Sequence, residues 1–172
     1  MKKNKGFSLV ELLVALLIFG IFVAVSIALG RNAIQRASII KTVNNFLADF
    51  SYLKQSAARE NRYFALEFNN LGTSYTIYKQ RTIGDLDTMD EVKFVTPLDG
   101  TEFFSSTDVQ HFAVNSVGEV FAYDPTGSPR IDTSQVTGRQ LLFAIRSKGG
   151  EGMQYQRRIT IYPSGGINVR NE

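Results

Sequence analysis

A long apolar run dominates the first part of the chain. From Leu12 to Val25, fourteen consecutive residues carry no polar side chain, and Ser26 is the only interruption before Leu29. A helix from Leu9 to Leu29 rises about 31 Å, which is close to the thickness of the hydrocarbon core of a bilayer. The pattern therefore predicts a membrane-length helix.

After Gly30 the apolar residues recur at every third or fourth position, which is typical of one face of an amphipathic helix. No proline occurs before Pro97, so nothing forces the helix to end early. We therefore expect a single helix from about Ser8 to about Glu60, whose second half packs an apolar stripe against a globular head. The stripe consists of Ala33, Ala37, Ile40, Val43, Leu47, Phe50, Leu53 and Ala57.

From Tyr63 onward the hydrophobic period changes to two, which is typical of strands separated by turns. Turn signals rich in Gly, Asn and Pro punctuate this region, and we expect an antiparallel two-sheet or Greek-key-like head and hence an α+β fold. The expected strands lie at 63–68, 74–81, 91–95, 102–105, 109–114, 119–123, 140–147, 156–162 and 167–170. The expected organisation is a leader (1–6), a membrane or filament-core helix (7–30), an amphipathic helix (31–60) and the head (61–172).

The formal net charge of +3 comes from the first six residues, which contain three lysines and no acid. The remaining charges are unevenly spread. Residues 82–138 have two basic and ten acidic side chains, whereas residues 139–172 have six basic and two acidic ones. A uniformly basic nucleic-acid binder is thereby disfavoured, although a local basic face is not. The absence of cysteine excludes disulfides and thiolate chemistry.

A basic head before an apolar run fits an ordinary secretory signal peptide, a plain membrane anchor or a type IV prepilin leader. The segment Lys5–Leu12 closely resembles the type IV pilin and pseudopilin signature, in which a short basic leader ends in glycine, an aromatic residue follows, and glutamate is the fifth residue after the glycine. Here these residues are Gly6, Phe7 and Glu11. The resemblance identifies the chain as a type IV prepilin rather than a secreted or simply anchored protein.

The resemblance implies a specific maturation. A prepilin peptidase would cut between Gly6 and Phe7 and methylate the new amine of Phe7, leaving the apolar helix on the mature protein. Glu11 of an incoming subunit would then neutralise the Phe7 amine of a neighbour, because neither charge is tolerated alone in a low dielectric. The alternative for Glu11 is a location at the level of the lipid headgroups.

The order of a long helix, the element Gln55–Arg62 and then only strands looks like the GspH/FimT-like group. This group contains H-class type II secretion pseudopilins and minor type IV pilins. It implies other pilins, a prepilin peptidase and an inner-membrane assembly platform as partners. It also implies a single pass through the cytoplasmic membrane, with the head on the periplasmic or extracellular side.

The remaining chemistry-bearing residues are sparse, and we expect no enzymatic activity and no cofactor. His111, the single histidine, lies within a predicted strand and has no evident catalytic partners. The acidic cluster with Asp85, Asp87 and Asp90 is a weak calcium candidate, because it lacks the spacing of a calcium loop. The preferred interpretation of this cluster is an exposed acidic loop.

A second function class remains open. Some FimT-like minor pilins bind DNA during uptake through basic residues near the C-terminal glycine turn, often around a Gly-Arg-x-Arg element. This chain has Gly165–Arg170 there, with one arginine of that element missing. Arg157, Arg158 and Arg170 are the tentative DNA-binding residues. The preferred function is a minor pilin or pseudopilin that acts in initiation or at the tip of a filament; the alternative is a DNA-binding minor pilin in natural competence.

Overall fold

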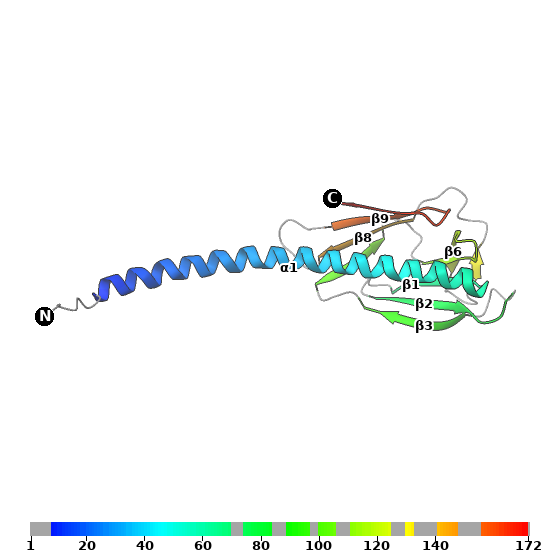
Figure 1. Cartoon of the computed structure of the whole chain (residues 1–172), viewed down its shortest axis with the longest axis horizontal. Coiled ribbons are helices and arrows are strands. Elements are labelled where there is room, and N and C mark those ends of the chain that lie inside the picture. Colours follow the sequence, from blue (N-terminus) through cyan, green and yellow to red (C-terminus); the bar gives the residue numbers. More distant parts are fainter. Residues whose placement is uncertain are drawn as a thin grey trace. The chain divides into compact units, whose positions relative to one another are not determined.

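A computed structural model describes residues 8–69, 74–83, 89–96, 100–105, 111–124, 130–132, 141–147 and 156–171. One helix, α1 (Leu9–Glu60), is followed by antiparallel strands, which confirms the α+β class (Figure 1). The chain divides into two compact units, residues 1–36 and 37–172. The strands are β1 (Phe64–Phe68), β2 (Tyr75–Gln80), β3 (Met89–Val95), β4 (Thr101–Ser105), β5 (His111–Val114), β6 (Val120–Asp124), β7 (Arg130–Asp132), β8 (Leu141–Ser147), β9 (Gln156–Ile161) and β10 (Ile167–Asn171).

The first unit consists of the N-terminal part of α1. The segment Leu9–Ile27 is long and apolar enough to cross a membrane, and none of it is buried within the structure. Its large apolar side chains are exposed along the whole segment. Because exposed surface of this kind is unfavourable in water, the segment requires a lipid or protein environment.

In the second unit α1 buries one face against the head, but this face is not quite the predicted stripe. Ala33, Ala37 and Ile40 are exposed, and burial begins at Ile39. Phe46, which the predicted stripe omitted, is completely buried. Neighbouring apolar residues such as Phe46 and Leu47 make the exact facing of a helix ambiguous from sequence alone. The buried residues recur at steps of three and four: Ile39, Thr42, Val43, Phe46, Asp49, Phe50, Leu53, Ser56 and Ala57.

The strands form two antiparallel sheets. The six-stranded sheet has the order β3-β2-β1-β5-β6-β7, and the four-stranded sheet has the order β10-β9-β8-β4. Both sheets and α1 contribute to one continuous core. The ring of Phe68 from β1 lies 5.2 Å from that of Phe103 in β4 and 4.9 Å from that of Phe143 in β8, while Phe46 of α1 lies 5.9 Å from Phe103. The expectation of a two-sheet head is thereby confirmed.

The sequence pattern missed one strand. Arg130–Asp132 forms β7, a three-residue edge strand paired with β6. It follows the Pro-containing turn signal 124–129, of which residues 125–129 lie outside the described part, and a strand of three residues is too short to show a period of two. The predicted hairpin at 115–118 is confirmed: Asn115 Oδ1 accepts hydrogen bonds from the backbone N–H groups of Val117 and Glu119.

Two hairpin turns from different sheets meet beside α1. The backbone N–H of Val120 donates to Pro163 O (2.9 Å), and Lys54 Nζ donates to Gly165 O (2.9 Å). Gly165 has a φ of +74°, and a Cβ atom there would lie 1.9 Å from Gly118 O. Only glycine fits this position, because the backbone conformation and the contact both exclude a side chain.

Candidate functional site

The first residues of α1 form a reciprocal cap. The backbone N–H of Ser8 donates to Glu11 Oε2 (2.9 Å), and the backbone N–H of Glu11 donates to Ser8 Oγ (3.3 Å). These two bonds satisfy backbone donors that have no partner within a helix. A carboxylate in the first turn also complements the positive end of the helix dipole. Sequence reasoning missed this cap, although the Ser-x-x-Glu spacing was a sufficient signal.

The cap leaves part of the Glu11 carboxylate available. Its Oε1 atom accepts no hydrogen bond from the described part of the chain, and the side chain is exposed. A single carboxylate can accept several hydrogen bonds, so capping its own helix does not prevent Glu11 from accepting a further donor. Gly6 and Phe7, the predicted cleavage and methylation residues, lie outside the described residues.

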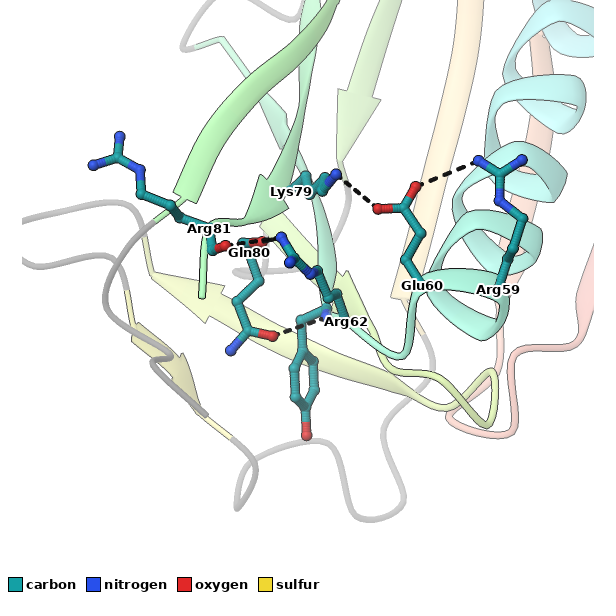
Figure 2. Close-up of polar contacts among 7 residues, drawn as sticks. Arg59, Glu60, Arg62, Lys79, Gln80 and Arg81 are labelled. Atoms are coloured by element: carbon teal, nitrogen blue, oxygen red, sulfur yellow. Dashed lines mark hydrogen bonds and ion pairs between the residues drawn. The ribbon is translucent and has the colours of Figure 1, made fainter. Parts of the chain in front are cut away.

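The element Gln55–Arg62 ends the helix and attaches it to the six-stranded sheet (Figure 2). Asn61 has a φ of +50°, the left-handed conformation common just after a helix end. Arg62 Nη1 then donates to the backbone oxygens of Gln80 (3.2 Å) and Arg81 (2.8 Å). Gln80 in turn accepts a hydrogen bond from the Tyr63 N–H through its side-chain Oε1 (3.2 Å).

An ion pair completes this junction. Lys79 Nζ lies 2.7 Å from Glu60 Oε2, and Arg59 lies on the other side of the same carboxylate at 3.4 Å (Figure 2). The hydrogen bond from Lys79 is the main cause of the lowered pKa of Glu60. The residues of Gln55–Arg62 that suggested a pseudopilin thus have a structural role in this chain, since they fix where the helix stops and the sheet begins.

The structure separates the three tentative DNA-binding arginines. Arg158 of β9 and Arg170 of β10 are direct cross-strand partners and both are exposed. Arg157 pairs with Asn171 instead, and lies on the opposite face of the sheet, because successive side chains alternate along a strand. On β8, Arg146 lies on the Arg158 face, but it is bonded to Glu102 (2.5 Å).

The acidic cluster is only partly described. Asp85 and Asp87 lie outside the described residues, and Asp90 Oδ1 accepts hydrogen bonds from Nε (2.8 Å) and Nη2 (2.6 Å) of Arg81. These bonds are the main cause of the lowered pKa of Asp90. Among the described residues no three His, Cys, Asp or Glu side chains gather to hold a metal ion.

The single histidine lies in a strand, as expected. His111 begins β5, and its cross-strand partner is Glu67 of β1. Burial raises the pKa of the Glu67 carboxyl, and a hydrogen bond with Tyr78 partly opposes this effect. His111 and Glu67 are thus a cross-strand pair of the six-stranded sheet.

A capped, membrane-length helix whose second half packs on an antiparallel β head is the architecture of type IV pilins and pseudopilins. Residues 1–27 match the family model of the prokaryotic N-terminal methylation motif. No match is found among curated protein sequences.

Two solved structures share the fold. The type IV minor pilin FimU of Pseudomonas aeruginosa is 15% identical, with a TM-score of 0.55, over 79% of this chain and 90% of that chain. The minor pseudopilin EpsH from the type 2 secretion system of Vibrio cholerae is 16% identical, with a TM-score of 0.54, over 77% of this chain and 94% of that chain. The motif match over residues 1–27 and the shared fold both support the resemblance to type IV pilins and pseudopilins.

Proposed function

We propose that this chain is a minor pilin or pseudopilin, a structural subunit of a type IV pilus or a type II secretion pseudopilus that acts in initiation or at the tip. The observation that carries the proposal is the methylation motif before the apolar span Leu9–Ile27, whose only acidic residue, Glu11, caps the start of the helix. The shared fold with FimU and EpsH supports the same role. The role is structural rather than enzymatic.

The proposed maturation follows from the leader. A prepilin peptidase removes residues 1–6 by cutting between Gly6 and Phe7, and the amine of Phe7 is methylated. The helix 7–30 anchors the chain in the inner membrane by a single pass, residues 31–60 carry the head, and residues 61–172 lie on the periplasmic side. Other pilins and an assembly platform are the partners through which the helix moves from lipid into the filament.

Glu11 has a distinct role in this scheme. Its free oxygen accepts the Phe7 amine of a neighbouring subunit, so that two charges enter the filament core as a pair. Removing one partner of such a buried pair destabilises by about 3–5 kcal/mol, because an uncompensated charge remains. The energy is large enough to decide whether a subunit enters the filament.

The test separates processing from assembly. Gly6→Leu should block the mature-length product, whereas Glu11→Val should be processed and inserted but enter filaments poorly. Glu11→Gln, which keeps a hydrogen-bond acceptor and loses the charge, isolates the electrostatic part. Normal incorporation of Glu11→Val contradicts the charge-pairing role, and a mature-length product from Gly6→Leu contradicts prepilin processing.

The cross-strand pair of Arg158 and Arg170 favours one alternative function, a DNA-binding minor pilin for uptake in competence. Two adjacent exposed guanidinium groups can contact phosphates, and such contacts weaken steeply with salt. A gel-shift titration with the full-length chain in detergent tests this alternative. Arg158→Ala with Arg170→Ala should abolish salt-dependent retardation, and Arg157→Ala, on the other face, is the matched control. Absence of any retardation by the unmodified chain ends this alternative.

A further inference from the structure

Two of the strands that end the sheets, β3 and β10, differ in character. β3 is the last strand of the six-stranded sheet and β10 is the last strand of the four-stranded sheet, so each pairs with one described strand only. In β3, five consecutive residues from Asp90 to Phe94 are exposed. Among them Phe94 is 59% exposed and Val92 is 41% exposed. Exposed apolar side chains on an edge strand offer a surface for contact with another chain.

The charges that remain on these edges are of opposite sign. On β3, Asp90 is paired with Arg81 and Lys93 with Asp49, while Glu91 is exposed and has no ion pair within the described residues. On β10, Arg170 is exposed and likewise has no ion pair there, and its cross-strand partner is a second cation, Arg158. The sequence shows the same asymmetry, with a strongly acidic segment 82–138 and a basic segment 139–172.

We propose that the β3 edge of one copy contacts the β10 edge of a second copy, with Phe94 and Val92 as the apolar contact and Glu91 opposite Arg170. Because the two surfaces differ, the contact is heterologous. A heterologous contact joins one copy to the next without a two-fold axis between them. The inference rests on the proposed role as a filament subunit, and it assigns a head-to-head contact in addition to the contacts of the N-terminal helix.

The β-bulge in β3 limits the form of this contact. The register between β2 and β3 shifts between Ile77 and Tyr78, so that Val92 has no direct partner in β2. A bulge interrupts regular hydrogen bonding and discourages extension of the sheet. The contact is therefore made mainly by side chains at the end of β3 around Phe94, rather than by a long added strand.

The chain offers a direct test, because it contains no cysteine. Two differently tagged full-length copies are co-expressed in membranes, one with Val92→Cys and the other with Asn171→Cys, and treated with a short bismaleimide. We expect a covalent dimer of the two tags. Val117→Cys in place of Val92→Cys is the control, because Val117 is 76% exposed but lies on the β5–β6 turn and belongs to neither β3 nor β10.

Charge exchange tests the pairing itself. Adding Glu91→Arg to the Val92→Cys copy should lower the yield by about threefold, the effect of roughly 0.7 kcal/mol for an exposed pair. Adding Arg170→Glu to the Asn171→Cys copy should restore the dimer yield. Phe94→Ser should also lower the dimer yield, and Arg170→Glu should not restore it. The proposal is overturned if Val117→Cys gives the same dimer yield as Val92→Cys, or if Arg170→Glu does not restore the yield. It is also overturned if the β3 cysteine is cross-linked to a different protein. Processing and membrane insertion are scored in the same samples, so failure there counts against the proposed function instead.

Discussion

Lys93 Nζ lies 2.5 Å from Asp49 Oδ1, and this ion pair joins the edge strand β3 to α1. Asp49 is nearly buried in the apolar face of the helix, and its other oxygen accepts a hydrogen bond from the Tyr75 hydroxyl (2.6 Å). Burial and the Asp49 carboxylate both raise the pKa of Tyr75, so the hydroxyl remains a donor. A buried carboxylate is thus supported by one cation and one hydroxyl from neighbouring strands.

Asp49→Ala should destabilise the head by about 2–3 kcal/mol, because it leaves a buried hydroxyl without its acceptor and an ammonium without its counter-ion. Urea unfolding in detergent, followed by tyrosine fluorescence, measures the change. Lys41→Met, which removes an exposed cation from the same helix, is the control and should change the free energy of unfolding by less than about 0.5 kcal/mol. An unchanged midpoint for Asp49→Ala contradicts this account.

Gly165→Ala should destabilise by about 2–4 kcal/mol, since the methyl group adds a steric clash with Gly118 O to the strain of a positive φ. Gly100→Ala is a matched control. Gly100 has a similar φ of +83°, but a Cβ atom there has open space around it, so only the backbone strain of about 1 kcal/mol applies. Equal losses in the two variants would show that crowding between the turns contributes nothing.

Ser8→Ala should loosen the start of α1 by about 1 kcal/mol, the usual effect of losing a helix cap. Hydrogen exchange of the Glu11 backbone amide, which donates to Ser8 Oγ, should become faster by roughly fivefold in detergent micelles. Ser26→Ala is the control, because the Ser26 hydroxyl bonds to Phe22 O within the helix rather than to its end. Unchanged exchange in Ser8→Ala would mean that the hydrogen bond from the Glu11 N–H to Ser8 Oγ is not formed in the micelle.

Glu67→Gln should stabilise the head at neutral pH. Burial raises the folded-state pKa of Glu67, so the folded state holds this proton more tightly than the unfolded chain does. The favourable contribution is present below the raised pKa and is lost as the pH rises through it. The advantage of Glu67→Gln should therefore be seen at pH 7 and vanish at about pH 3. Urea unfolding at the two pH values, with the exposed Glu91→Gln as control, tests the sign.

The sequence predicted the parts of the fold that are encoded locally. The apolar run, the continuous helix and most strands follow from hydrophobic period and turn residues, and the structure confirms them. Phe46 was missed because two adjacent apolar residues are compatible with two helix faces, and the sheets decide between them. The strand order, in which β5 lies beside β1, depends on contacts between distant segments, and no local pattern carries it.

The candidate site also contains residues that the local sequence identifies and residues that only the folded structure brings together. Glu11 could be singled out because a carboxylate at the start of an apolar run is exceptional in sequence. The opposite faces of Arg157 and Arg158 follow from strand alternation. The meeting of Arg158 with Arg170 could not be assigned, because it depends on the register of β9 with β10. The structural role of Arg62 also depends on two backbone oxygens that only the folded β2 strand brings near.

The hydrogen bond from Lys54 to Gly165 joins residues 111 positions apart, and it uses a turn that precedes the last strand. Chains rich in such distant contacts fold slowly, because most of the polypeptide must be present before they form. A nascent chain that has emerged only as far as Tyr162 contains every strand of the six-stranded sheet but lacks β10 of the four-stranded sheet. The four-stranded sheet is therefore completed only by residues that follow Tyr162, and a truncation before Gly165 removes the acceptor of the Lys54 hydrogen bond.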